Sequence, residues 1–369
     1  MNKKQLYFLD IYIEEDYGWF ASYNCNGLFG INFITGDVKC IGIFPAEKSN
    51  TQFMFNNIVC QNDQLFFIPD MFDSIGIYDR KSEKLICKVI PQEITDKKSF
   101  CFSTFYNNNL ILFPSNASFI LRYNIEKQII EKVEISELKQ TGFCFTSRFF
   151  AQFDEKIYVP VQGKNEILEV DLATKKYRFH TVGKDGEIFC SMCQQDKNIW
   201  LVEAYTGKLV KYDTKSESYQ EFAMRPNGYR CIKEHGYIIA YMFYDEEWIY
   251  IVPSTANMVL KFNVITESYE IMDTYEKWEQ KEFPFYVDSN HGVLASRYVN
   301  KKIYSLRAGD LKLLVYDTSN CDSKKEIDLI TDEKQYVEKC YLYNPNEIFL
   351  REDTDAYGLK DYLLLLHKI

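Results

Sequence analysis

The sequence predicts an all-β fold, a β-propeller of about eight four-stranded antiparallel blades, with seven blades as the alternative. Three observations support this prediction: a phrase that recurs with a nearly constant period, a proline that keeps step with it, and a high aromatic content. Tyr and Phe contribute 28 residues each to the 369. Because flat rings suit the pleated surface of a strand, this composition favours many short strands over helices.

The period is set by an Asp or Asn that ends an aromatic or aliphatic run and precedes a polar turn. These anchors are Asn32, Asp79, Asn124, Asp171, Asp213, Asn263 and Asp317. Consecutive anchors lie between 42 residues apart (Asp171 to Asp213) and 54 residues apart (Asn263 to Asp317). Asp and Asn suit such turns because their side chains accept hydrogen bonds from backbone N–H groups further along and so close a hairpin.

A proline marks a second position in the repeat. Pro69, Pro114 and Pro253 each lie 10 residues before an anchor, and Pro160 lies 11 before its own. Proline within a sheet is confined to edges, strand ends and bulges, so these prolines are expected to end the second strand of each unit. A further strand precedes each of them and ends in a polar turn such as 61–63, which makes four strands per unit.

Four-stranded units that repeat every 40 to 50 residues or so are typical of propeller blades. We expect the blades at 6–45, 55–91, 100–136, 148–183, 189–224, 236–274, 285–330 and 336–369. The last unit is short, so seven blades remain open if the two ends of the chain share one blade. No low-complexity linker interrupts the repeats, and 1–369 is expected to form a single propeller domain.

Charge and hydropathy exclude several functions. The net charge is −10 and the basic residues are scattered, so nucleic acid is not expected as a partner. No signal segment and no run of about 18 apolar residues is found, which favours a cytoplasmic protein with no membrane partner. The 11 cysteines are odd in number and irregularly spaced, so we expect buried free thiols rather than disulfides.

The segment 197–203, KNIWLVE, followed by 208–213, KLVKYD, resembles the repeat of bacterial propellers of the streptogramin-lyase-like and kelch-like kind. Weaker versions of this pattern recur in most other repeats, so the resemblance covers nearly the whole chain, and it implies the propeller fold. The chain departs from kelch repeats by having no Gly-Gly pair and from WD repeats by having no Trp-Asp pair. Lyases of the streptogramin group need a His that works with a Glu, and with only four His here the activity is not carried over.

Catalytic and metal-binding motifs are weak. His235 and His291 lie near connections between blades and are the candidates for acid or base chemistry, while His180 lies in a fourth strand where a blade is expected to meet solvent. Surface or structural histidines are the simpler interpretation. Cys190 and Cys193 form a lone Cys-x-x-Cys without the second pair that a zinc site requires. We therefore expect no metal and no cofactor, and the catalytic residues remain unknown.

The sequence places a binding surface more readily than a reaction. In a propeller, the loops between second and third strands share one face with the connections between blades, around the central channel. Arg and Tyr are enriched at binding hot spots, and guanidinium groups meeting at one mouth would bind a carboxylate or phosphate. The candidate ligand-binding residues on this face are Arg148, Glu203, Tyr205, Arg225, Tyr229, Arg230, Arg297 and Arg307.

These observations favour a non-catalytic platform that binds a protein or a small anionic or carbohydrate ligand through the loop face. The alternative is a lyase or glycan-acting enzyme with its site at the channel mouth. A monomer is expected in either case.

Overall fold

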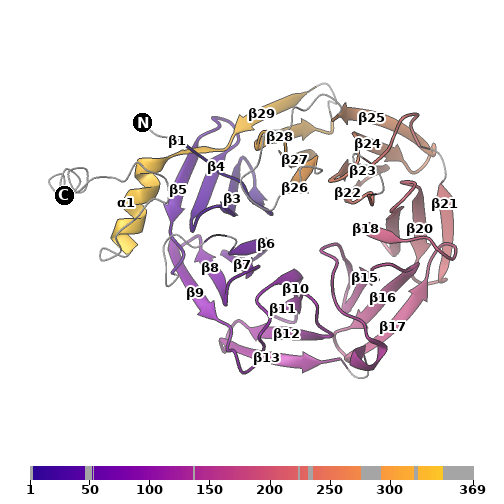
Figure 1. The fold of residues 1–369 in the computed structure, drawn as a ribbon, viewed down its shortest axis with the longest axis horizontal. Coiled ribbons are helices and arrows are strands. Elements are labelled where there is room, and N and C mark those ends of the chain that lie inside the picture. Colours follow the sequence, from indigo (N-terminus) through magenta and orange to yellow (C-terminus); the bar gives the residue numbers. More distant parts are fainter. Residues whose placement is uncertain are drawn as a thin grey trace.

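The computed structural model of the chain is a ring of seven blades, each a four-stranded antiparallel sheet (Figure 1). The propeller prediction is therefore confirmed, with the smaller of the two blade numbers. The structure describes residues 3–45, 52, 54–135, 138–222, 225–231, 236–275, 292–319 and 323–343.

The first four blades are built from consecutive strands. Blade 1 contains β2 (Tyr12–Glu14), β3 (Tyr17–Ala21), β4 (Leu28–Asn32) and β5 (Val38–Gly42). Blade 2 contains β6 (Phe55–Gln61), β7 (Gln64–Pro69), β8 (Ser74–Asp79) and β9 (Lys84–Val89). Blade 3 contains β10 (Phe100–Tyr106), β11 (Asn109–Pro114), β12 (Phe119–Asn124) and β13 (Ile129–Glu134). A short 3-10 helix (Leu138–Thr141) precedes blade 4, which contains β14 (Ala151–Phe153), β15 (Lys156–Pro160), β16 (Glu166–Asp171) and β17 (Lys176–Thr181).

The remaining three blades follow the same plan. Blade 5 contains β18 (Phe189–Gln195), β19 (Asn198–Glu203), β20 (Leu209–Asp213) and β21 (Ser218–Phe222). Blade 6 contains β22 (Ala240–Asp245), β23 (Trp248–Pro253), β24 (Met258–Asn263) and β25 (Ser268–Thr274). Blade 7 contains β26 (Val293–Val299), β27 (Lys302–Arg307), β28 (Lys312–Asp317) and β29 (Lys324–Asp328).

The order of strands within a blade fixes two distinct faces of the ring. The first strand lies nearest the centre and the fourth lies outermost (Figure 1). Because consecutive strands are antiparallel, the loops between second and third strands lie on the same face as the connections between blades. The turns between first and second and between third and fourth strands lie on the opposite face.

The Asp and Asn anchors all begin the turn between third and fourth strands. Asp213 is representative: its Oδ1 accepts the N–H groups of Lys215 at 2.8 Å and Ser216 at 2.9 Å. The other anchors accept backbone N–H groups in the same way: Asn32, Asp79, Asn124, Asp171, Asn263 and Asp317. The predicted prolines are likewise the last residues of β7, β11, β15 and β23. Both markers of the repeat are confirmed.

The expected eighth blade at 336–369 is wrong where the structure describes it. Residues Glu333–Tyr343 form helix α1, and 344–369 lie outside the described residues. The buried side chains of Tyr336, Val337 and Cys340 share one helical face and pack on blade 1, whereas a strand would bury alternate residues. Asp332 caps the helix by accepting the N–H of Lys334 at 2.9 Å. Among the described residues, no helix is both long and apolar enough to cross a membrane.

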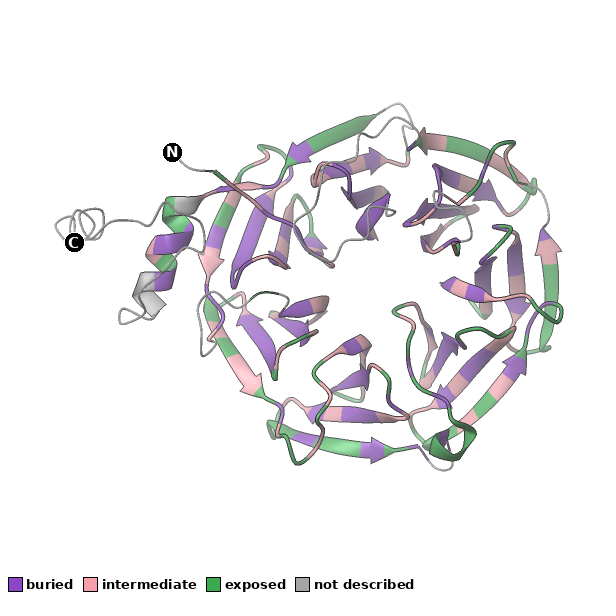
Figure 2. Cartoon of the chain, in the orientation of Figure 1, coloured by how far each residue is buried: buried purple, intermediate pink, exposed green. Residues whose placement is uncertain are grey.

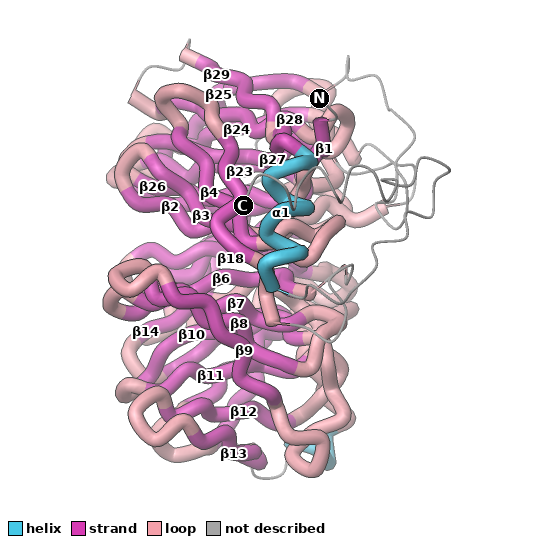
Figure 3. Tube along the Cα trace, turned by 90° about the vertical axis from the view of Figure 1, so that its left-hand side faces the viewer, coloured by secondary structure: helices cyan, strands magenta, loops and turns pink. Residues whose placement is uncertain are grey.

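In the part of the chain that the structure describes, no blade combines strands from both ends. Instead β1 (Lys3–Gln5) pairs antiparallel with β30 (Ile330–Asp332) in a separate two-stranded sheet. The Lys325 ammonium, from the outer strand of blade 7, donates to the carbonyl oxygens of Phe33 at 2.6 Å and Ile34 at 2.8 Å in blade 1. Blades 1 and 7 are thus joined by side chains and by strands outside them, and Figure 3 shows α1 against the edge of the ring beside them.

The hydrophobic core lies between the blades. Each cluster of buried apolar side chains found in the described part of the chain joins neighbouring blades. Trp200 of blade 5, for example, packs on Phe262 of blade 6 with their ring centroids 5.9 Å apart. Figure 2 shows the burial concentrated in the inner strands and exposed residues along the outermost ones. A ring held by such contacts leaves its loops free to carry binding groups.

Candidate functional site

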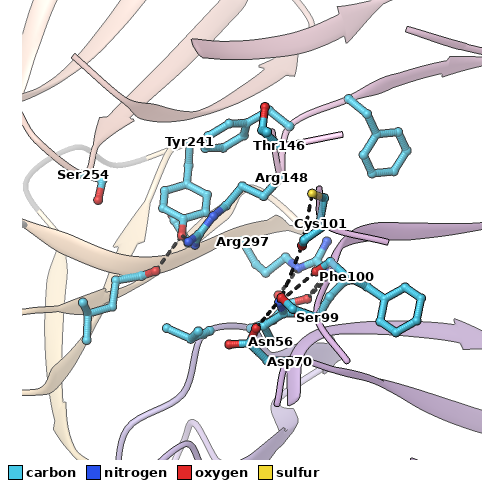
Figure 4. Close-up of a pocket in the computed structure, with 18 of the residues that line it drawn as sticks. Asn56, Asp70, Ser99, Phe100, Cys101, Thr146, Arg148, Tyr241, Ser254 and Arg297 are labelled. Atoms are coloured by element: carbon cyan, nitrogen blue, oxygen red, sulfur yellow. Dashed lines mark hydrogen bonds and ion pairs between the residues drawn. The ribbon is translucent and has the colours of Figure 1, made fainter. Parts of the chain in front are cut away.

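A cavity of about 560 Å³ opens where the inner strands converge on the loop face (Figure 4). Its volume is in the range of small-molecule sites. Four loops between second and third strands contribute Tyr23, Asp70, Ser115 and Ser254. The other lining residues come from inner strands or from the connections that lead into them: Leu9, Asp10, Asn56, Asn57, Ser99, Phe100, Cys101, Thr146, Arg148, Phe149, Phe150, Met192, Tyr241, Met242, Phe243, Leu294, Ser296 and Arg297. Both kinds of segment share this face, as expected.

The wall of the cavity differs in chemistry from one side to the other. Blades 1 to 3 and 7 supply most of the carboxylates, amides and hydroxyls. Blades 4 to 6 supply partly exposed aromatic rings, of which Phe149 and Tyr241 meet edge to face with centroids 5.5 Å apart. Phe243 and the buried Met192 continue this apolar side. The cavity therefore suits a ligand with one polar and one apolar part.

Asp70 provides a fixed carboxylate on the polar side. Its Oδ2 accepts the hydroxyl of Tyr23 at 2.5 Å, and its Oδ1 accepts the hydroxyl of Ser99 at 2.6 Å. Burial, and then the charge of Asp70, raise the pKa of Tyr23 well above its ordinary value, so Tyr23 remains a neutral donor. Since each carboxylate oxygen can accept more than one hydrogen bond, Asp70 keeps capacity for a ligand.

Arg148 provides a positioned cation between the two sides. Its Nη1 donates to the Tyr241 hydroxyl at 3.0 Å, and that hydroxyl donates to the carbonyl oxygen of Leu294 at 2.6 Å. The pKa of Arg148 is raised, first by Tyr241 and then, against desolvation, by Asp70 and Asp10. The side chain remains accessible to solvent, and Tyr241 is its one hydrogen-bond partner among the described residues. Several of its N–H donors are therefore available.

Arg297 belongs to the wall in a different way. Its Nε and Nη2 donate to the two carboxylate oxygens of Asp10 at 2.7 and 2.6 Å, and Nη2 also donates to the carbonyl oxygen of Ile58 at 3.1 Å. Asp10 in turn accepts the side chain of Asn57 at 2.9 Å and the N–H of Ile58 at 2.8 Å. Arg297 lies within inner strand β26 rather than in a connection, and its charge is matched by Asp10.

The structure brings only two of the eight candidate ligand-binding residues to the cavity, Arg148 and Arg297. Arg225 donates to the carbonyl oxygen of Thr206, and the N–H of Arg230 donates to Asn257. Neither lines the cavity, so the expectation that these arginines meet Arg148 and Arg297 at one mouth is wrong. Their connection lies between blades 5 and 6, away from the polar side.

The other four candidates lie in blades 5 to 7 or the connections between them. The buried Glu203 accepts the N–H groups of Tyr205 and Thr206 and so closes its own loop. Tyr205 is exposed beside Tyr237, with centroids 5.3 Å apart. Tyr229 is buried, and burial raises its pKa. Arg307 is buried between two carboxylates, Asp310 and Glu326.

Catalytic candidates gain little support. His180 is buried between Glu169 at 2.9 Å and the Tyr212 hydroxyl at 2.9 Å, so its expected exposure is wrong. His235 and His291 lie outside the described residues. Cys101 lines the cavity, but burial raises the pKa of its thiol, which disfavours the nucleophilic thiolate.

The expectation of buried thiols holds for only some of the described cysteines: Cys25, Cys40, Cys193 and Cys340 are buried, five others are partly buried, and Cys144 is exposed. All cysteines in the described part of the chain are free thiols, and Cys321 lies outside it. Within those same residues, no group of three or more His, Cys, Asp or Glu side chains could hold a metal ion. Burial raises the pKa of Cys190 to about 11, which disfavours a thiolate ligand.

Several wall residues were missed because they lie at the start of inner strands rather than in loops. Asp10 and Asn57 line the cavity, and Ser103, which does not, occupies the next equivalent position: Asn57 donates to Asp10 and accepts the hydroxyl of Ser103. The separations are 47 and 46 residues, close to the repeat. Superposing the repeats on the inner strand, rather than on the Asp and Asn anchors, would have brought these residues together.

Comparison with known proteins supports the fold alone. No protein-family model matches the chain, and no curated protein matches it. Among solved structures it is similar to a catalytically inactive virginiamycin B lyase from Staphylococcus aureus with quinupristin, at TM-score 0.59 and 14% identity over 90% of this chain and 98% of that one. It is also similar to the computationally designed Ika8 protein, at TM-score 0.55 and 7% identity over 89% and 87% of the two chains.

A third similar structure is the extracellular domain of a one-component system, BT4673, from B. thetaiotaomicron. The TM-score is 0.56 and the identity 12%, over 87% of this chain and 41% of that one. The resemblance to streptogramin-lyase propellers thus extends to the fold over 90% of this chain, while the kelch-like resemblance stays a prediction. At these identities the similarity carries no activity over to this protein.

Proposed function

We propose that this protein is a non-catalytic ligand-binding propeller whose site is the central cavity. The observation that carries the proposal is Arg148: an accessible guanidinium, held in place by Tyr241, with donors to spare beside a cavity of about 560 Å³. Ligand sites combine an apolar lining with a few placed polar groups, and the two sides of this wall have that composition. A cytoplasmic, monomeric protein that binds a small ligand rather than nucleic acid or membrane is part of the same proposal.

The enzymatic alternative, a lyase or glycan-acting enzyme, would need an acid or base at the wall. None of the described lining residues is a histidine, and each carboxylate oxygen of Asp70 accepts a hydrogen bond from a hydroxyl group. A carboxylate fixed at both oxygens is well placed to accept further hydrogen bonds from a ligand.

A blocked cavity tests the proposal. Thr146→Trp places a large ring at an exposed position of the wall, and Gln162→Trp places the same ring in an exposed loop of the same face outside the cavity. Thermal shift against amino acids, dipeptides, sugars, sugar phosphates and nucleotides should find a compound that stabilises the parent and Gln162→Trp but not Thr146→Trp. Recovery of that compound unchanged, by mass spectrometry, is the expected result for a binding protein.

Three results would contradict the proposal. Equal stabilisation of Thr146→Trp would place the ligand elsewhere, and a chemically altered compound would favour the enzymatic alternative. If no compound in the panel stabilises the parent protein, the cavity is not a site for these small molecules.

A further inference from the structure

We propose that the cavity binds a zwitterion, a free amino acid or short peptide with an apolar side chain, whose carboxylate contacts Arg148 and whose ammonium contacts Asp70. This inference rests on the proposed function and names the class of ligand. It is carried by the charges that remain in the wall after internal pairing is taken into account.

The wall contains four charged side chains, two of each sign. Arg297 and Asp10 are bonded to each other through two hydrogen bonds, so neither offers its charge to a ligand. Among the described residues, Arg148 and Asp70 form no ion pair with each other or with any other side chain, and their partners are hydroxyl groups. One positive and one negative group therefore remain available.

The presence of one available positive group and one available negative group distinguishes between classes of ligand. A phosphate or other simple anion would gain from Arg148 but would be repelled by Asp70, whose field reaches Arg148. A neutral sugar could bond both groups but would leave both charges uncompensated. A ligand with a carboxylate and an ammonium matches both, because charge-assisted hydrogen bonds are the stronger kind.

The surroundings of Arg148 indicate the rest of the ligand. The hydroxyl that holds Arg148 belongs to Tyr241, which lies on the apolar side with Phe149. A carboxylate at Arg148 thus brings the adjoining side chain of the ligand against aromatic rings. Asp70, with Ser99, lies on the polar side and would take the amino group. An aromatic C-terminal residue with a free N-terminus fits this order.

The test uses alanyl-phenylalanine and free phenylalanine with the purified full chain, measured by isothermal titration calorimetry. The two compounds separate a peptide from an amino acid. N-acetylated and C-amidated forms of the dipeptide each remove one charge. A charged hydrogen bond contributes at least about 1.5 kcal/mol, so each blocked form should bind about tenfold more weakly or worse.

Two variants link each loss to its residue. Arg148→Met should weaken the free dipeptide about tenfold or more and leave the C-amide unaffected, while Asp70→Asn should weaken the free dipeptide and leave the N-acetyl form unaffected. The controls are Arg178→Met and Asp328→Asn, which remove the same charges from exposed outer strands. Unchanged thermal melts establish that the variants fold, and Arg148→Lys should restore part of the binding.

The outcomes of these experiments distinguish the zwitterion proposal from the proposed function on which it rests. Equal binding of free and blocked dipeptides, or full binding by Arg148→Met, overturns the zwitterion. Binding of maltose or inorganic phosphate in the cavity, blocked by Thr146→Trp, with no binding of either zwitterion, also overturns it but leaves the proposed function standing. If none of these probes and no compound of the wider panel binds, both proposals fail.

Discussion

Replacing Asp10 by Ala tests how the ring is closed between blades 1, 2 and 7. The Asp10 carboxylate accepts two hydrogen bonds from Arg297 of blade 7, one from the Asn57 side chain and one from the Ile58 N–H of blade 2. Asp10 itself leads into blade 1. One side chain therefore ties together three blades, of which blade 7 is distant along the chain from the other two.

The expected loss of stability follows from the hydrogen bonds that each partner of Asp10 loses. Removing one member of a buried ion pair costs about 3–5 kcal/mol, and a buried donor left unsatisfied costs about 1–3 kcal/mol. The Asp10 side chain is 10% exposed, but that of Arg297 is 38% exposed and can turn to water in the cavity, which reduces the penalty. We expect Asp10→Ala to lower the free energy of unfolding by about 2–4 kcal/mol.

The assay is urea unfolding followed by circular dichroism, with the free energy taken from the midpoint and slope. Asp328→Ala, on the exposed outer strand of blade 7, is the matched control and should stay within about 0.5 kcal/mol of the parent. Arg297→Met should cost less than Asp10→Ala, because Asp10 keeps its two donors from blade 2. The double variant should cost less than the sum of the single ones. Strict additivity, or a loss below about 0.5 kcal/mol for Asp10→Ala, would refute this account of closure.

Three further predictions concern acid stability, turn geometry and thiols. Hydrogen bonds, led by that from His180, lower the pKa of Glu169 from 4.5 to about 2. The stability that the Glu169 carboxylate contributes is therefore present above pH 4.5 and lost as the pH falls towards 2. Over this range the melting temperature should fall less steeply in Glu169→Gln than in the parent, and equal dependence of the two melting temperatures on pH would exclude the effect. Lys175 has a φ of 58°, so Lys175→Gly should stabilise by about 0.5–1 kcal/mol and Lys176→Gly, in a strand, should destabilise by a similar amount, measured by urea unfolding. Alkylation and mass spectrometry under denaturing conditions should count 11 free cysteines, and a melting temperature that depends on reductant would contradict this.

The fold could be predicted because its markers are local. An anchor such as Asp213 and a proline such as Pro160 act within a few residues of themselves, and their order along the chain is the order of the strands. The end of the chain was misread for a related reason. At 333–343 the apolar spacing is that of a helix, with Tyr336, Val337 and Cys340 on one face, but the expectation of another repeat outweighed it.

The site was predicted less well because side-chain pairing is not local. Sequence reasoning found Arg148 and Arg297 as cations near the centre, but nothing near them in the chain shows that Arg297 is matched by Asp10, 287 residues away. Nor does it show that Arg225 turns to its own neighbouring loop. Choosing residues by type selects arginines, whereas the chemistry of the cavity depends on which arginine keeps an unmatched charge.

The repeated turns and the cavity lie on opposite faces of the ring. This explains why the fold could be predicted from the sequence and the cavity residues less well. Turns with anchors such as Asp79 and Asn263 repeat from blade to blade because each closes the same hairpin, and they lie on the face away from the cavity. The positions that line the cavity do not close these turns, so they need not carry the same residue type in every blade. They hold a carboxylate at Asp10, an amide at Asn57 and a guanidinium at Arg148. A ring of like blades can therefore present unlike groups at its centre, and the ligand is specified by the positions at which the repeat is least regular.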